Sequence, residues 1–151
     1  MSRTANLVLA SLGCVLALAG CNKADPNSPA GKRHAAYEEM GDAMKALGEV
    51  LKENAPNLSN AAGPIATLKT QSAIVPTLFP AGSGPEGGQP TEALPAIWQR
   101  PAEFSAAMNR FTTAVAALDA AAKTGDVKTT RAAAANLGQT CKGCHDNFKK
   151  K

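Results

Sequence analysis

The motif Cys141-Lys142-Gly143-Cys144-His145, close to the C-terminus, constrains this chain of 151 residues more than any other feature. Two cysteines three positions apart, followed directly by a histidine, form the attachment pattern of a c-type haem. Each thiol would add across one haem vinyl group, and the His145 imidazole would then become an axial ligand of the iron. On a helix, Cys141 and Cys144 would lie one turn apart on one face, with His145 beside them. The motif therefore predicts one covalently attached haem c per chain.

Other interpretations of the motif leave part of it unexplained. A structural zinc site needs four ligands, usually from a second pair of cysteines or histidines, and the sequence leaves no such pair over. A thioredoxin-type redox pair would follow a strand, and this chain has little strand character. A plain disulfide would not need the adjacent His145. Haem attachment is the interpretation that uses all three residues.

Residues 1–20 predict an export signal. Arg3 supplies a positive start, and residues 7–19 form an apolar segment that is short for a membrane span. The segment Leu18 to Cys21 resembles the lipobox of bacterial lipoproteins, in which the peptide is cut before a cysteine that carries a diacylglycerol. The alternative is ordinary cleavage nearby, which leaves Cys21 as a free thiol in an oxidising compartment. We expect the lipoprotein and, because Asn22 is not an aspartate, a periplasmic protein anchored to the outer membrane.

The composition of the whole sequence favours packed helices. The sequence is 44% hydrophobic but only 4% aromatic, and it is rich in alanine, which suits a helical bundle better than a β-sandwich. Residues 21–31 contain prolines, a serine and a glycine and predict a flexible tether, which leaves residues 32–151 as the folded domain. The net charge of +4 is scattered, apart from the C-terminal lysines. No basic patch with interleaved aromatic residues is present, so nucleic-acid binding is not expected.

Apolar residues recur at helical spacing in four segments, at about residues 32–53, 58–78, 101–123 and 127–149. Gly63-Pro64 indicates that the second segment either kinks there or begins only after the proline. Residues 80–91, rich in proline and glycine, predict a long crossover loop, and Ile97-Trp98 a short helical turn. The fourth segment places the haem cysteines on its inward face. Together these features predict an all-α, antiparallel four-helix bundle with covalently bound haem.

Four stretches of the sequence form a recognisable combination: residues 33–47, Leu78-Phe79-Pro80-Ala81-Gly82, Ala96-Ile97-Trp98 followed by Phe104, and residues 137–145 followed by Lys149. With these stretches the chain resembles the cytochromes c prime. The resemblance covers roughly residues 32–149. A haem motif near the C-terminus is itself typical of this family, since ordinary small cytochromes c carry theirs near the N-terminus. The resemblance implies a periplasmic four-helix bundle, frequent homodimers, and a five-coordinate, high-spin haem whose distal face is covered by a side chain of the first helix.

The resemblance also assigns the distal residues. By alignment the covering side chain is Tyr37, where low-spin relatives carry a ligating methionine, so the resemblance implies an open distal site. Met40 and Met44 lie on the apolar stripe of the first helix and are expected to pack in the distal pocket rather than to bind iron. His34 lies one turn before Tyr37. We expect it at the surface or at the propionate edge of the haem, with iron ligation as the alternative.

Two basic residues complete the expected site. Arg33 could pair with a haem propionate, or could simply be solvated at the start of the first helix. Lys149 lies four residues after His145 and matches the proximal basic residue of the family. The resemblance implies that Lys149 tunes the strength of the His145 ligand.

The expected function is that of a monohaem cytochrome that exchanges electrons with redox partner proteins, binds nitric oxide or carbon monoxide at an open distal site, or does both. Gas binding needs a vacant, apolar distal pocket, which the tyrosine at position 37 favours over a methionine. The alternative is a low-spin, six-coordinate electron carrier with a methionine or His34 as the sixth ligand. No distal acid–base pair of the peroxidase kind is visible, so enzymatic activity is not expected.

Overall fold

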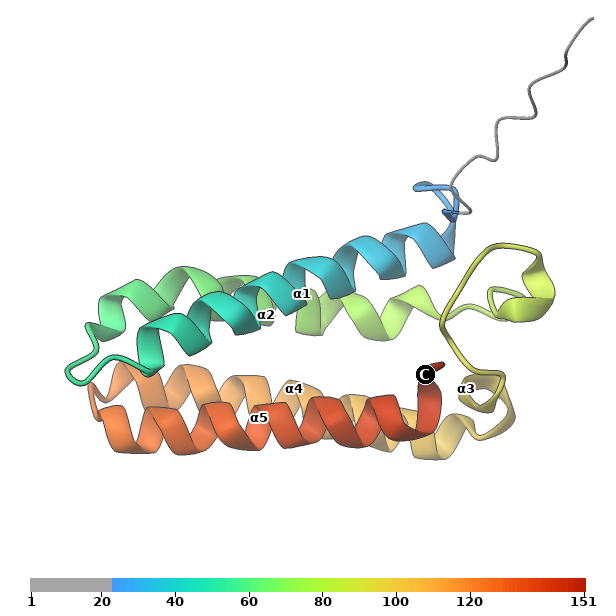
Figure 1. The fold of residues 1–151 in the computed structure, drawn as a ribbon. Helices are drawn as coiled ribbons and strands as arrows, with labels where there is room; N and C mark the ends of the chain where they lie inside the picture. The colour runs from blue at the N-terminus through green and yellow to red at the C-terminus, as the bar shows by residue number, and fades with distance from the viewer. Residues whose placement is uncertain (1–22) are drawn as a thin grey trace, which may run out of the picture.

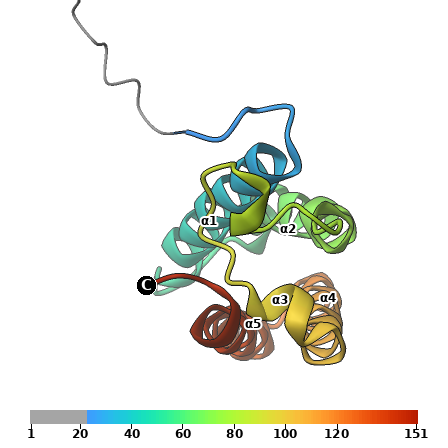
Figure 2. The ribbon, with the colours of Figure 1, turned by 90° about the vertical axis from the view of Figure 1, so that its right-hand side faces the viewer.

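The computed structural model describes residues 23–151, so the predicted export signal and Cys21 lie outside the described residues. Four long helices form the body of the molecule: α1 (Pro29–Leu51), α2 (Ala62–Ile74), α4 (Pro101–Lys123) and α5 (Val127–Phe148). Figures 1 and 2 show α1 and α2 as one layer over α4 and α5. Each helix runs antiparallel to both of its neighbours. The predicted all-α, antiparallel four-helix bundle is therefore confirmed.

Helix α1 begins three residues earlier than predicted. The Ser28 hydroxyl accepts a hydrogen bond from the backbone N–H of Gly31 at 3.1 Å, and Pro29 occupies the first helical position. Both features are favourable at a helix N-terminus, because the hydroxyl satisfies a free N–H and proline has none to satisfy. Residues 29–31, which the sequence assigned to the flexible tether, are therefore helical, and the predicted tether boundary is wrong by three residues.

The C-terminal end of α1 is held by a residue from the opposite layer. The Arg131 guanidinium on α5 donates from Nε to the carbonyl of Leu51 at 2.8 Å and from Nη2 to the carbonyl of Glu53 at 2.7 Å. The last carbonyls of a helix have no partner within the helix, so a cation there satisfies them and also interacts favourably with the helix dipole. Arg131 therefore satisfies carbonyls at the end of α1, which stops two residues before the predicted end.

The second predicted helix is divided into three parts. A 3₁₀ turn over Leu58–Ala61 (η1) leads into α2, and a second 3₁₀ turn over Val75–Leu78 (η2) follows it. Pro64 lies in the first turn of α2, where a missing N–H costs nothing. Neither predicted alternative, a kink at Gly63-Pro64 or a start only after Pro64, holds as stated, because α2 begins at Ala62, two residues before the proline.

The crossover loop, residues 79–95, connects the two layers and contains one short 3₁₀ turn, Pro85–Gly87 (η3). It leads into the predicted short helical turn, α3 (Ala96–Gln99). The indole N–H of Trp98 donates to the carbonyl of Pro80 at 3.0 Å, so the loop is tied back to its own beginning. Helix α4 has the predicted bounds, and α5 ends at Phe148, one residue before the predicted end.

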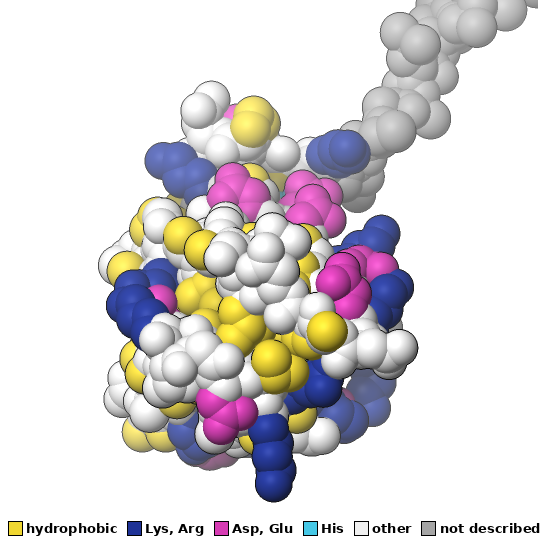
Figure 3. All heavy atoms as spheres, turned by 90° about the vertical axis from the view of Figure 1, so that its left-hand side faces the viewer, with side chains coloured by type: hydrophobic (Ala, Val, Ile, Leu, Met, Phe, Trp, Pro, Cys, Tyr) yellow, Lys and Arg dark blue, Asp and Glu magenta, His cyan; other side chains and the backbone are white. Residues whose placement is uncertain are grey.

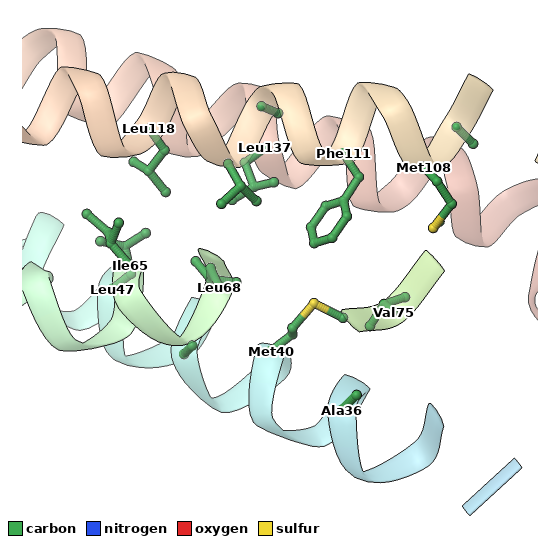
Figure 4. Close-up of a cluster of buried hydrophobic side chains, with 14 of the residues drawn as sticks. Ala36, Met40, Leu47, Ile65, Leu68, Val75, Met108, Phe111, Leu118 and Leu137 are labelled. Carbon is green, nitrogen blue, oxygen red and sulfur yellow. The ribbon is translucent and has the colours of Figure 1, made fainter. Parts of the chain in front are cut away.

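The core divides into two parts along the bundle (Figure 4). Leucines from all four helices fill one part and are almost completely buried: Leu47, Leu68, Leu118 and Leu137. Methionine and phenylalanine side chains follow them toward the crossover loop, among them Met40, Met108 and Phe111. The leucine part supplies close packing, whereas the second part lies where α1 and α5 face each other around the haem motif.

The end of the bundle opposite the crossover loop carries basic and acidic side chains interspersed around apolar ones (Figure 3). Within residues 23–151, none of the helices combines the length and the hydropathy that a bilayer crossing would require.

The leucine part of the core should carry much of the stability. Leu118→Ala removes a side chain with 0% exposure that does not line the cavity described below, and it should lower the free energy of unfolding by about 2–5 kcal/mol. Ile74→Ala removes an apolar side chain that is 42% exposed and should change the stability by only about 0.5 kcal/mol. Urea denaturation of the two variants makes the comparison. Equal losses of unfolding free energy in the two variants would mean that the buried leucines contribute no more to stability than an exposed side chain.

Candidate functional site: a haem cavity between α1 and α5

A cavity of about 880 Å³ opens between the N-terminal half of α1 and the C-terminal half of α5. Its volume lies within the range of roughly 300–1,000 Å³ that is usual for cofactor and ligand sites. Apolar side chains of α1, α2 and α4 form its inner wall: Tyr37, Met40, Met44, Leu68, Phe104, Met108 and Phe111. Pro90 to Ala93 of the crossover loop and the residues after α5 form part of its rim. The cavity is therefore an apolar slot that ends at the haem motif.

The haem motif lies on one wall of this cavity. Cys141 and Cys144 are half-buried free thiols on the inner face of α5, where both pack against the hydrophobic core. Burial raises the pKa of both thiols, that of Cys144 to about 11, so both are protonated at neutral pH. His145 also lines the cavity but is exposed at its rim. Helix α5 thus brings together all three residues that the motif predicted, in the order that haem attachment needs.

The opposite wall is formed by α1. The ring of Tyr37 lies edge-on to the His145 ring, with 6.4 Å between the two ring centroids. Burial raises the pKa of the Tyr37 phenol well above its ordinary value, so the hydroxyl is neutral. Tyr37 therefore faces the predicted proximal ligand across the cavity, which is the placement expected of a distal residue.

The other predicted distal residues are also in or near the cavity. Met40 is buried and Met44 is half-buried, and both line the cavity from α1. His34 lies at the rim with an exposed side chain, where its Nε2 is 3.2 Å from the Glu38 carboxylate. This is the surface or edge position that the sequence predicted for His34.

Arg33 does not have the solvated position that was one of its two predicted environments. Its side chain is buried, with only 3% exposure, and it reaches under the crossover loop. Nη1 donates to the carbonyl of Leu78 at 2.9 Å and to the Ser83 hydroxyl at 2.8 Å, and Nη2 donates to the Ser83 carbonyl at 2.6 Å. Nη2 also donates to the Thr91 hydroxyl at 3.2 Å. The structure therefore overturns the solvated alternative.

The same guanidinium lies over two aromatic rings of the loop region. Its central carbon is 4.9 Å from the centroid of Phe79 and 5.8 Å from that of Trp98, both within cation–π distance. Of the five N–H donors of the guanidinium, the four on Nη1 and Nη2 are matched by the four hydrogen bonds to the protein. A haem propionate would have to compete with these bonds, so the main contacts of Arg33 are with the loop that borders the cavity.

Lys149 lies directly after α5, and its backbone N–H donates to the His145 carbonyl at 3.1 Å. Its ammonium pairs with the Glu92 carboxylate at 2.8 Å. Partial burial of the ring and the nearby Lys149 ammonium both lower the pKa of the His145 imidazole. The predicted proximity of Lys149 and His145 is present, and Glu92 is a partner that sequence analysis did not find.

Other cavity residues were missed for different reasons. Met108 and Phe111 belong to the apolar stripe of α4, and their position opposite the haem cysteines could have suggested a role in the cavity. Thr91 and Glu92 lie in the crossover loop, where no local pattern marks them. They reach the site because Arg33, Lys149 and backbone hydrogen bonds to the end of α5 hold the loop against the bundle.

The cavity fits a c-type haem. Two half-buried thiols one turn apart lie beside an apolar slot, and an imidazole at its rim is free to bind iron. A four-helix bundle with this motif on the inner face of its last helix defines a cytochrome c of the bundle class. The family model of cytochrome c prime matches residues 28–149, and the chain belongs to this family. As in other members of the family, one haem c is attached covalently.

Individual relatives agree with this assignment. Cytochrome c prime of Rubrivivax gelatinosus is 48% identical over 91 residues, which cover 60% of this chain and 69% of the relative. Its crystal structure aligns with a TM-score of 0.74 at 37% identity, over 82% of this chain and 98% of that one. The nitric oxide complex of a cytochrome c prime variant from Alcaligenes xylosoxidans aligns with a TM-score of 0.73 at 30% identity, over 83% and 98% of the two chains. A carbon monoxide-bound variant from the same organism has a TM-score of 0.75 at 31% identity, over 85% and 99%.

The crossover loop should depend on the guanidinium of Arg33. Arg33→Lys keeps the charge but cannot make four hydrogen bonds in a fixed planar fork, so buried carbonyls lose their donors. We expect the free energy of unfolding to fall by about 1–3 kcal/mol and amide hydrogen exchange at Ser83 and Gly87 to accelerate. The matched control is Lys32→Gln, one residue away and exposed, which should leave both quantities unchanged. Unchanged exchange in Arg33→Lys would show that the loop is ordered by other contacts.

Proposed function

We propose that this cytochrome binds a small gas, nitric oxide or carbon monoxide, on the distal side of its haem. The observation that carries the proposal is the side chain opposite His145: it is the tyrosine at position 37, and the two cavity methionines lie one and two turns further along α1. A neutral phenol is a weak iron ligand, whereas a methionine thioether in that position is a ligand of low-spin cytochromes. With Tyr37 opposite His145, the iron would remain accessible to an exogenous ligand.

The residues of this chain have separate tasks in that function. Bound haem supplies an iron that can take up a diatomic ligand and change its oxidation state. Cys141 and Cys144 would fix the ring against α5, and His145 would hold the iron. Tyr37 stands in the path to the other side and limits which ligands enter.

The surrounding wall favours a small neutral ligand. Met40, Met108 and Phe111 are buried and surround the cavity with apolar atoms, which exclude water and offer few hydrogen-bond donors. Dioxygen needs such donors for stable binding and should remain a poor ligand. The nitric oxide and carbon monoxide complexes of the Alcaligenes xylosoxidans variants support the proposal at the level of the family.

Electron transfer with a periplasmic redox partner is the second candidate. The exposure of His145 at the rim favours it, because electron exchange needs a haem edge close to the surface. In this function the iron would be low-spin if Met40, Met44 or His34 became the sixth ligand. We propose a binding and electron-transfer role rather than catalysis, since Tyr37, Met40 and Met44 include no acid–base pair.

Tyr37→Ala separates the two functions. If the distal site is open, the resting ferric protein is high-spin before and after the change, and the ferrous form binds carbon monoxide and nitric oxide faster, because a bulky side chain has left the path to the iron. Absorption spectra report the spin state, and stopped-flow mixing with carbon monoxide reports the rate.

Two further variants identify the ligand if the resting protein is instead low-spin. Loss of the low-spin spectrum in Met40→Ala would make Met40 the sixth ligand and the protein an electron carrier. Loss of that spectrum in His34→Ala would assign the ligand to His34. Either result would contradict gas binding at an open site.

We also propose that the chain is exported to the periplasm and anchored by a lipid on Cys21. The support is the sequence from Leu18 to Cys21 after a short apolar run. Intact mass spectrometry of the protein extracted from membranes should give a chain that begins at Cys21 and carries a diacylglycerol. Cys21→Ser should release the protein from the membrane fraction. An unmodified N-terminus at another residue would contradict the lipid anchor without affecting the haem site.

A further inference from the structure

The crossover loop meets the end of α5 in a short antiparallel bridge. The backbone N–H of Leu94 donates to the carbonyl of Phe148 at 2.9 Å, and the N–H of Lys150 donates to the carbonyl of Glu92 at 2.7 Å. Ala93 and Lys149 therefore lie opposite each other, although 56 positions separate them in the sequence. Glu92 and Lys149 are both fixed by this bridge, one on each strand of it.

The backbone bridge favours the ion pair between Glu92 and Lys149. The two side chains are 69% and 44% exposed, and an exposed pair of this kind contributes little when both side chains must be ordered for it. Here the backbone of both residues is already held by hydrogen bonds, so less conformational freedom is lost when the 2.8 Å contact forms. The Lys149 ammonium is thus kept on the Glu92 side of the cavity rim.

We propose that Glu92 is a positioning residue for the proximal side of the haem, which holds Lys149 in place and offsets its charge next to His145. The proposal rests on His145 being the axial ligand. The resemblance to the family gives the proximal role to the basic residue alone. In this chain the basic residue is paired with the Glu92 carboxylate, so the two charges would act on the haem together.

The pair has a predictable effect on the iron because ferric haem carries one more positive charge than ferrous haem. A lone ammonium near His145 disfavours the ferric form and withdraws electron density from the imidazole, which raises the reduction potential and weakens the iron–histidine bond. A neighbouring carboxylate has the opposite effect on both quantities. Removing Glu92 and removing Lys149 should therefore shift the reduction potential and the iron–histidine bond strength in opposite directions. Loss of a purely structural contact would not produce opposite shifts.

The test uses three variants of the haem-loaded protein. Glu92→Gln should raise the midpoint potential and lower the iron–histidine stretching frequency in the resonance Raman spectrum of the ferrous form. Lys149→Gln should shift both quantities the other way. The double variant should return close to the wild-type values, because the two charges are removed together.

Asp119→Asn is the matched control. Asp119 on α4 pairs with Lys69 on α2, also at 2.8 Å and also across a long sequence separation, but neither residue lines the haem cavity. This variant should affect stability without moving the potential or the stretching frequency. Shifts of the same sign in Glu92→Gln and Lys149→Gln, or no shift in Glu92→Gln, would overturn the proposal. A low-spin wild-type spectrum would contradict the open distal site but leaves the sign test intact, since the midpoint potential can still be measured with a six-coordinate iron.

Discussion

The structure depends on a core that changes its character along the bundle. Leucines from all four helices are almost completely buried in one part and pack the helices together. In the other part, methionine and phenylalanine side chains line a cavity of about 880 Å³ between α1 and α5. An empty apolar cavity of this size is costly, because its walls lose packing contacts. The leucine part makes the cavity possible, and a flat apolar cofactor then restores the contacts that the walls lack.

The crossover loop closes one side of this cavity, and two cations from the bundle hold it there. Arg33 reaches the loop from α1 with three hydrogen bonds and a contact with the Phe79 ring, and Lys149 reaches it from the end of α5. A loop rich in glycine and proline has little structure of its own, and its order comes from these contacts. The loop in turn brings Glu92 to the proximal side, so that a segment without any sequence motif contributes a charge to the site.

The two walls of the cavity, α5 and α1, have different roles. Helix α5 carries everything that attaches the haem and holds its iron, and its spacing allows little variation. Helix α1 faces it with Tyr37. A change on α1 would leave the attachment residues intact, which is why we propose that the side chain at position 37 decides between gas binding and electron transfer.

Features that depend on local spacing could be predicted from the sequence. The haem motif predicted the cofactor and its three attachment residues, and helical periodicity predicted the four helices, in α4 to the residue and in α1 and α5 to within a few residues. Pro64 predicted that the second helix is interrupted near its start, since proline suits a first turn.

Contacts between segments far apart in the chain could not be predicted in this way, and they became visible only in the folded bundle. The sequence near Arg33 shows a basic residue at a helix start, for which a solvated position is reasonable, and only the folded loop turns it into a buried anchor. Glu92 has no neighbour in sequence that marks it, because its partner lies 57 positions away. Local patterns report which face of a helix is apolar. They do not report which distant backbone carbonyl accepts hydrogen bonds from a charged side chain, or which distant ammonium pairs with it, because these partners depend on how the layers pack.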